Sequence, residues 1–311
     1  YRCLGLGPID AFGFRIDADL DRLATRGSQH KLIACFGGSS VFSVQCLHHQ
    51  MFSQVMQRKL NEACNARGLD LEFTVLNFGQ NSHVILNQIQ TYEMFCAHLR
   101  PDVVISHDGH NELMWGQTND PFLVERGIVY PTDLEEWSRL LHAGQVSNTP
   151  NNGGAAKPAF NPPPKVVNAY LWRKRQFAST AMANGAAFLW ALQPLIWAKK
   201  GMTELEAPGV KYWMSHPEVG PAVLNLPRLF SMAASEPMAP GAIDANLYHH
   251  FGTLAADQTL FGDHVHLTPK GDAIVGNYYA ELILRLIDEG RIQSGSERSF
   301  YRRSMLCMMR F

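Results

Sequence analysis

Short unbroken apolar runs alternate with helix-spaced segments along the first third of the chain. The runs 31–36, 71–76 and 102–105 are apolar or rich in β-branched residues, and their length predicts strands buried in a sheet. Between them, residues 52–63 and 84–99 carry apolar side chains every three or four positions, which predicts amphipathic helices. Strands and helices that alternate in this way predict right-handed βαβ units and a mostly parallel sheet.

The middle of the chain is less regular. Residues 132–141 have the spacing of a capped helix, whereas 147–165 are rich in Asn, Gly and Pro and predict an irregular, flexible loop. Beyond this loop we expect a helix over 166–184 and a buried strand over 187–192. The stretch 215–252 is again rich in Pro and poorly periodic, which leaves it without a predicted element.

A last helix is predicted to begin after Thr268, an N-cap residue that is followed by Pro at the first helical position. Four residues at helical spacing are expected to face the sheet: Ile274, Tyr278, Leu282 and Leu286. The end of the chain, 291–311, is basic and then rich in Met, so we expect it to dock on a partner protein or on this domain.

The composition excludes several classes of function. Of 311 residues 46% are apolar and 18% charged, and the formal net charge is −1, so no overall field favours nucleic acid or an anionic membrane. No apolar run approaches the roughly 20 residues of a membrane span. We therefore expect neither a nucleic-acid partner nor a transmembrane helix. The six cysteines show no CxxC spacing, which favours free thiols over a disulfide framework.

The printed sequence begins at Tyr1 and not at Met, which leaves room for a targeting or anchoring segment before it. The localisation is therefore open. We favour an extracytoplasmic or anchored protein, with a cytoplasmic one as the alternative.

Two segments far apart in the sequence carry the residue types of serine-based acyl transfer. Ser39 follows Gly37 and Gly38 directly after the first predicted strand, so its hydroxyl is held on a tight turn. Near the other end, Asp263 and His266 are three residues apart in a predicted loop. A serine nucleophile, a histidine base and an acid that orients the base are the minimum for this chemistry.

Two further residues follow the second and third predicted strands. Gly79 can offer an unobstructed backbone N–H to a developing negative charge, and the amide of Asn111 is a neutral oxyanion donor. Taken alone, Gly79 is equally typical of a strand-exit turn and Asn111 of a helix cap. In a parallel sheet the loops at the carboxyl ends of strands share one edge, so these residues are expected to lie near Ser39.

The ordered set resembles the SGNH (GDSL-type) hydrolase family. Its four blocks correspond to Gly37-Gly38-Ser39, Gly79, Gly109-His110-Asn111 and Asp263-His264-Val265-His266. The resemblance covers about residues 31–287, and it implies a three-layer α/β/α, flavodoxin-like sandwich with a mostly parallel central sheet. The sequence departs from the family pattern in two places, because Gly38 stands where the name-giving motif has Asp and Glu112 where many members have Asp.

The resemblance also implies the roles of the residues. Ser39 is the expected nucleophile, His266 the general base and Asp263 the group that orients it. The backbone N–H groups of Ser39 and Gly79 and the Asn111 side chain are the expected oxyanion hole. Neither a cofactor nor a metal is expected.

For the whole chain, the resemblance implies a serine esterase that cleaves small acyl esters through an acyl-enzyme on Ser39. It also suggests a small acyl ester or an acylated glycan as the substrate. We expect an SGNH-like domain over 31–290, with an extension before it over 1–30 and the tail 291–311 after it. A long insert, about 117–260, is expected to include the flexible loop.

Three alternatives stay open. An O-acyltransferase would use the same triad, with a sugar hydroxyl in place of water. The fold could also serve as a non-catalytic assembly or binding subunit. A metal hydrolase could draw ligands from two groups of residues. These groups are His107, Asp108 and His110 in one loop, and Asp263, His264 and His266 in another. The metal reading leaves Ser39, Gly79 and Asn111 without a role.

Overall fold

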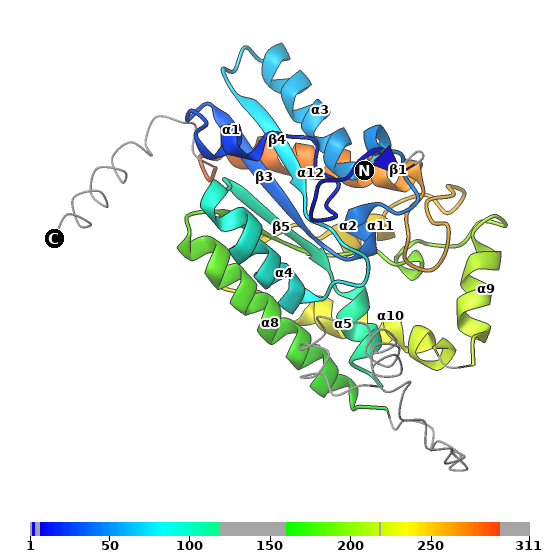
Figure 1. The fold of residues 1–311 in the computed structure, drawn as a ribbon. Helices are drawn as coiled ribbons and strands as arrows, with labels where there is room; N and C mark the ends of the chain where they lie inside the picture. The colour runs from blue at the N-terminus through cyan, green and yellow to red at the C-terminus, as the bar shows by residue number, and fades with distance from the viewer. Residues whose placement is uncertain (1, 4–6, 119–159, 218, 293–311) are drawn as a thin grey trace, which may run out of the picture.

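A parallel β-sheet lies at the centre of the computed structural model, which describes residues 2–3, 7–118, 160–217 and 219–292 (Figure 1). In sheet order its strands are β4 (Glu72–Asn77), β3 (His30–Gly37), β5 (Val103–Asp108), β6 (Ala187–Leu192) and β7 (Ile243–Asp244). Every pair of neighbours in this sheet is parallel. The order is the one typical of flavodoxin-like folds, in which ligands bind at the carboxyl ends of the strands. A short antiparallel pair, β1 (Arg2–Cys3) and β2 (Gly7–Pro8), lies outside the sheet.

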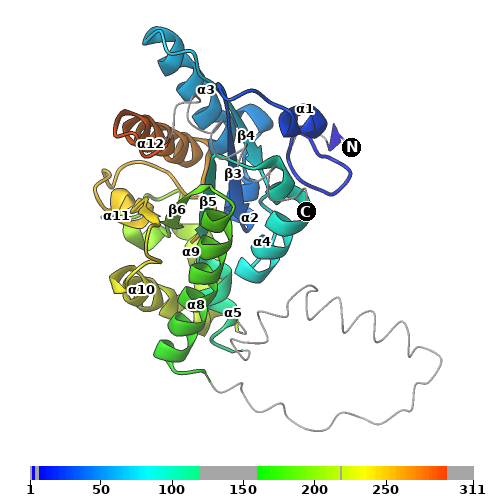
Figure 2. The same cartoon turned by 90° about the vertical axis from the view of Figure 1, so that its left-hand side faces the viewer.

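The two faces of the sheet carry separate hydrophobic cores. Because side chains alternate along a strand, Ile33 and Cys35 of β3 belong to one core, whereas Ala34 and Phe36 belong to the other. The first core is covered by α3 (Phe52–Ala66), α9 (Ala207–Ser215), α11 (Leu247–Gly252) and α12 (Pro269–Asp288). The second is covered by α1 (Leu20–Ala24), α4 (Ile85–Thr91), α5 (His110–Trp115), α8 (Pro163–Ala183) and α10 (Gly220–Ser235). Figure 2 shows α12 and α4 on opposite sides of the sheet. The expected three-layer α/β/α sandwich is confirmed.

The strands expected over 31–36, 71–76, 102–105 and 187–192 are all present, and β7 is an addition that pairs through only two residues. Among the helices, the one expected over 52–63 is α3, and it extends to Ala66. The helix expected over 84–99 is regular only as far as Thr91 and continues as a π-helical turn (Tyr92–Cys96) and a 3-10 turn (Ala97–Leu99).

The segment 215–252 is more regular than its periodicity predicts. It contains α10 and α11, and α10 holds one proline in its first turn and a second, Pro227, in its interior. Seven residues of α10 are buried, so tertiary packing stabilises a helix that its proline content argued against.

The last helix begins as expected, because the Thr268 side chain accepts a hydrogen bond from the Gly271 N–H. Its core-facing side includes the predicted residues, although two of them are not the most deeply buried ones. Leu282 and Leu286 are buried as expected. In the first half of the helix, however, Val275 and Tyr279 are buried, whereas Ile274 and Tyr278 are half-buried. Ile274 and Tyr278 pack at the margin of the same core, so all four predicted residues lie on the side of the helix that meets it.

The ends of the central segment meet at the base of α8. The Asn161 N–H donates to the carbonyl of Gln117 at 2.7 Å, and the Asn161 side chain donates to the carbonyl of Gly116 at 3.0 Å. The helix expected over 132–141 and most of the loop expected over 147–165 lie outside the described residues. Nearly all of the C-terminal tail lies outside them too. In the described part of the chain, no helix has both the length and the apolar character that a membrane crossing needs.

The segment before the first strand of the sheet packs on the sandwich. Phe14 and Ile16 pack into the second core, and Arg15 between them is fully buried. Its guanidinium donates hydrogen bonds to the carbonyls of Phe42 and Ser43, at the end of α2 (Ser39–Phe42). The N-terminal segment therefore braces the short helix that carries Ser39.

Candidate active site

Ser39 is the first residue of α2, directly after β3. The two glycines before it allow close packing on the neighbouring strand and loop. A side chain at Gly37 would overlap the carbonyl of His107, and a Cβ at Gly38 would lie 2.5 Å from Nδ2 of Asn111. The sequence therefore places the serine hydroxyl where β3, β5 and α5 meet, at the carboxyl edge of the sheet.

Ser39, His266 and Asp263 form an unbroken chain of hydrogen bonds. His266 Nε2 lies 2.8 Å from Ser39 Oγ, and His266 Nδ1 lies 2.6 Å from Asp263 Oδ2. Asp263 Oδ1 accepts hydrogen bonds from the backbone N–H groups of Val265 and His266, each at 2.8 Å. Burial alone would raise the pKa of Asp263. The hydrogen bonds from the His266 ring and the two N–H groups outweigh burial and hold the pKa well below its usual range.

A buried ion pair holds the loop that carries Asp263 and His266. Lys199 Nζ and Glu206 lie 2.7 Å apart and are both buried. Glu206 Oε1 also accepts hydrogen bonds from the N–H groups of Leu260 and Phe261. Burial raises the pKa of Glu206, but its hydrogen bonds, first that from Lys199, leave it lowered overall. The ion pair therefore fixes the start of the loop that carries Asp263 and His266.

Asn111 is the second residue of α5 and lies beside the turn that carries Ser39. Its Nδ2 donates to the carbonyl of His83 at 2.9 Å and is the atom that a Cβ at Gly38 would meet. Gly109, not Asn111, occupies the N-cap position of α5, so Asn111 is not the helix cap that its residue type allows. The structure thus brings the amide next to the turn that holds Ser39.

Gly79 lies against the same turn, but its N–H already has a partner. It donates to Asn77 Oδ1 at 2.9 Å, and a side chain at Gly79 would overlap the backbone of Val41 and Phe42 in α2. The close approach of the β4 exit to α2 therefore requires glycine. The oxyanion role of Gly79 stays a prediction, since this role needs the N–H to turn away from Asn77.

Two of the candidate metal ligands lie away from the site. His107 Nδ1 is 2.9 Å from the Tyr279 hydroxyl in the first core, and Asp108 pairs with the buried Lys174 at 2.8 Å. Burial lowers the pKa of His107 to about 3. Among the described residues, no three His, Cys, Asp or Glu side chains come together as a metal site.

Three residues next to the triad were not given a place in it by the sequence analysis. Gln193 directly follows β6, donates to Ser40 Oγ at 2.9 Å and accepts from the His110 N–H at 3.4 Å. His110 and His264 are hydrogen-bonded to each other through their Nε2 atoms at 2.9 Å. The position of Gln193 at a strand end was the available signal. Nothing in the spacing of His110 and His264 indicates that they meet.

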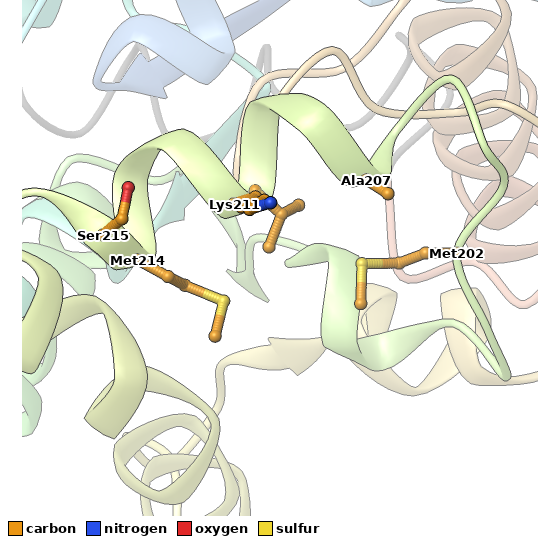
Figure 3. Close-up of a pocket in the computed structure, with 6 residues that line it drawn as sticks. Met202, Ala207, Lys211, Met214 and Ser215 are labelled. Carbon is orange, nitrogen blue, oxygen red and sulfur yellow. The ribbon is translucent and has the colours of Figure 1, made fainter.

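A pocket of about 370 Å³ opens on the side of α9 (Figure 3). It is lined mainly by apolar side chains, with Met202 and Met214 facing it, and it contains none of the triad residues. The same helix packs on the loop that carries Asp263 and His266, because a side chain at Gly209 would overlap the carbonyl of Gly262. The pocket and the loop that carries Asp263 and His266 therefore both contact α9.

No protein-family model and no curated protein matches the chain. Solved structures with a similar fold include three esterase-type proteins. An acetyl xylan esterase, AlAXEase, is 14% identical, with a TM-score of 0.45, over 81% of this chain and 99% of the other. The acetylxylan esterase Axe2 from Geobacillus stearothermophilus is 13% identical, with a TM-score of 0.43, over 81% and 93%.

The third is a putative lipolytic protein of the G-D-S-L family from Desulfitobacterium hafniense DCB-2. It is 11% identical, with a TM-score of 0.43, over 81% of this chain and 98% of the other. At these identities the likeness is one of fold, and the activity has to be argued from the site itself.

Proposed function

We propose that the protein is a serine esterase of the SGNH type. The observation that carries this proposal is the hydrogen-bonded chain from Ser39 Oγ through His266 to Asp263, at 2.8 and 2.6 Å. Ser39 and His266 are 227 positions apart in sequence, and His266 and Asp263 are three apart. Their contacts place a hydroxyl, an imidazole and a carboxylate in the order that serine-based catalysis requires.

The geometry supports a two-step reaction. Ser39 Oγ attacks the ester carbonyl while His266 Nε2 takes its proton, and Asp263 stabilises the imidazolium that forms. The Ser39 N–H and the Asn111 amide are the proposed donors to the oxyanion, joined by Gly79 if its N–H leaves Asn77. His266 then gives the proton to the leaving alcohol. Water activated by the same histidine releases the acyl group and restores Ser39.

The finer assignment is a small acyl ester on a carbohydrate or glycoconjugate. The motif resemblance supports this substrate class. The same acyl-enzyme serves an O-acyltransferase when a sugar hydroxyl, in place of water, attacks it. A non-catalytic subunit is disfavoured, because such a subunit has no need for a triad with hydrogen-bonded geometry.

The test uses the neighbouring serine as a matched control. Ser39→Ala is expected to lower the kcat for p-nitrophenyl acetate and for acetylated sugars by at least 10⁴-fold, because it removes the nucleophile. It is also expected to abolish labelling by a fluorophosphonate. Ser40→Ala keeps the label, since the Ser40 hydroxyl bonds to Gln193 instead of to His266.

If Ser39→Ala keeps its turnover, the nucleophile is misassigned. Wild-type protein that neither turns over any short-chain ester nor takes the label would favour the binding subunit. A chelator is expected to leave the activity unchanged. Loss of activity in the presence of the chelator would favour a metal hydrolase instead. Transfer of the acyl group to an added sugar in preference to water would identify the acyltransferase.

A further inference from the structure

We propose that His110 and His264 form a directional hydrogen-bonded pair that orients and polarises the Asn111 amide for the oxyanion. Both histidines are positioning residues that act through Asn111, and the inference rests on the proposed esterase function. The pair also joins the two halves of the site, because His110 belongs to α5 and His264 to the catalytic loop between Asp263 and His266.

The contacts form one continuous path. His264 Nε2 lies 2.9 Å from His110 Nε2, and His110 Nδ1 lies 3.1 Å from Asn111 Oδ1. Asn111 Nδ2 then donates to the carbonyl of His83 at 2.9 Å. One amide hydrogen remains on the same nitrogen, on the side where Gly38 leaves room next to Ser39.

The chemistry of the end groups fixes the direction of every hydrogen bond. A backbone carbonyl can only accept, so the His83 carbonyl requires the nitrogen of the Asn111 amide, and the amide oxygen must face His110. That oxygen also only accepts, so His110 carries its proton on Nδ1. His110 Nε2 of the neutral ring is therefore an acceptor, and His264 must carry its proton on Nε2.

The surroundings keep both rings neutral and in place. His264 is buried between Trp197 and Trp213, whose ring centroids lie 6.1 and 5.6 Å away. Its carbonyl accepts from the Ile196 N–H at 3.1 Å. Burial lowers the pKa of His110 to about 3 and that of His264 to about 4. Nδ1 of His264 is buried and has no hydrogen-bond partner within the described part of the chain, so a proton there would lack an acceptor, which agrees with a proton on Nε2 alone.

Two effects on the reaction follow. A hydrogen bond donated to the amide oxygen draws charge from the Asn111 N–H and makes it a better donor to the oxyanion. The path also fixes the position of the Asn111 amide relative to His266. These two residues belong to elements far apart in sequence, and the contact between His110 and His264, which are 154 positions apart, joins them. Because an oxyanion donor acts only at the correct distance, this coupling contributes to kcat and much less to KM.

Two substitutions of His110 separate orientation from packing. The amide nitrogen of Asn occupies about the place of a histidine Nδ1, whereas that of Gln occupies about the place of Nε2. His110→Asn keeps the donor to Asn111, and His110→Gln loses it. We expect His110→Gln to lower kcat about 10- to 100-fold with KM changed less than threefold. His110→Asn is expected to keep at least ten times more kcat than His110→Gln, although both variants lose ring packing and both melt earlier.

A double-mutant cycle tests whether His110 acts through Asn111. Asn111→Ala is expected to lower kcat about 10²- to 10³-fold as an oxyanion donor is lost. In that background His110→Gln is expected to add less than a threefold loss, because the group it positions is already absent. Equal kcat losses in the Asn and Gln variants, or full additivity in the cycle, would overturn the inference.

The tautomers give a readout that needs no turnover. In ¹⁵N–¹H correlation spectra of histidine-labelled protein at pH 7, we expect His110 as the neutral Nδ1–H form and His264 as the neutral Nε2–H form. The opposite tautomer at His110 would refute the path even in an active enzyme. An inactive wild type that shows both expected tautomers would instead refute the esterase proposal and leave the hydrogen-bonded pair in place.

Discussion

Replacing Asp263 by Asn is expected to disable the triad by reversing the tautomer of His266. Asp263 Oδ1 accepts from two backbone N–H groups, so in Asp263→Asn the amide oxygen has to occupy that position. The amide nitrogen then faces His266 Nδ1, where the carboxylate oxygen lies at 2.6 Å in the native protein. His266 must accept at Nδ1 and carry its proton on Nε2, which can no longer accept the proton of Ser39.

The magnitude follows from this reversal. A wrong tautomer in a serine triad lowers kcat about 10⁴-fold, which corresponds to about 5 kcal/mol of transition-state stabilisation. Steady-state hydrolysis of p-nitrophenyl acetate at pH 7 measures the loss, and KM is expected to change little. Because the two loop hydrogen bonds persist, the melting temperature should fall by no more than a few degrees. If Asp263→Asn keeps more than a tenth of the native kcat, Asp263 does not set the tautomer of His266 on which this reasoning rests.

Two further predictions concern packing and pH. Gly38→Ala places a Cβ in the space that Asn111 Nδ2 needs, so kcat should fall about 10²-fold. The matched control is Gly27→Ala, whose Cβ meets nothing within 4 Å. Equal kcat values in the two variants would contradict the contact between Gly38 and Asn111. The stability should also decrease from pH 6.5 toward pH 3, because the folded protein keeps His107 neutral with a pKa of about 3 whereas the unfolded chain binds a proton near its ordinary 6.5. Chemical denaturation across this range measures the slope, to which His110 and His264 contribute in the same direction. His107→Gln should make the slope less steep, and an unchanged slope would show that His107 contributes nothing to it. Asp272 has the opposite effect on the free energy of unfolding, because burial raises its pKa to about 7 and the folded protein therefore binds its proton more tightly than the unfolded chain. Its contribution to stability is present at low pH and is lost as the pH rises through 7.

The sequence predicted the sheet well because its strands are buried on both faces. A short uninterrupted apolar run such as that of β3 is typical of a strand buried on both faces, and each segment that was predicted to be a strand is one. The most deeply buried positions of α12 were harder to predict, because apolar residues at both 274–275 and 278–279 fit a helical stripe. The packing of Tyr279 against His107 and Phe52 decides between them. The two-residue strand β7 is too short to leave a periodic signal.

The site was predictable only where its residues form local motifs. Ser39 follows a strand and two glycines, and Asp263 and His266 are close in sequence, so their types and spacing indicated the chemistry. Their support is not local. Glu206 holds the loop that carries Asp263 and His266 from more than 50 residues away in sequence, and His110 meets His264 from 154 residues away. Such contacts depend on how the elements pack, which the order of residues along the chain does not reveal.

The hydrogen bonds between Asn161 and the segment Gly116–Gln117 hold together the two described ends of the chain that flank residues 119–159. A segment whose two ends are already tied together can be shortened or exchanged without changing the distance that the flanking helices must span. We expect a short Gly/Ser linker in place of residues 119–159 to leave the sheet and the Ser39–His266 contact intact. The same property would let related chains vary this part of their length freely while the chemistry stays fixed. The start of α8 is therefore a position where a foreign segment could be inserted while the sheet and its surrounding helices stay unchanged.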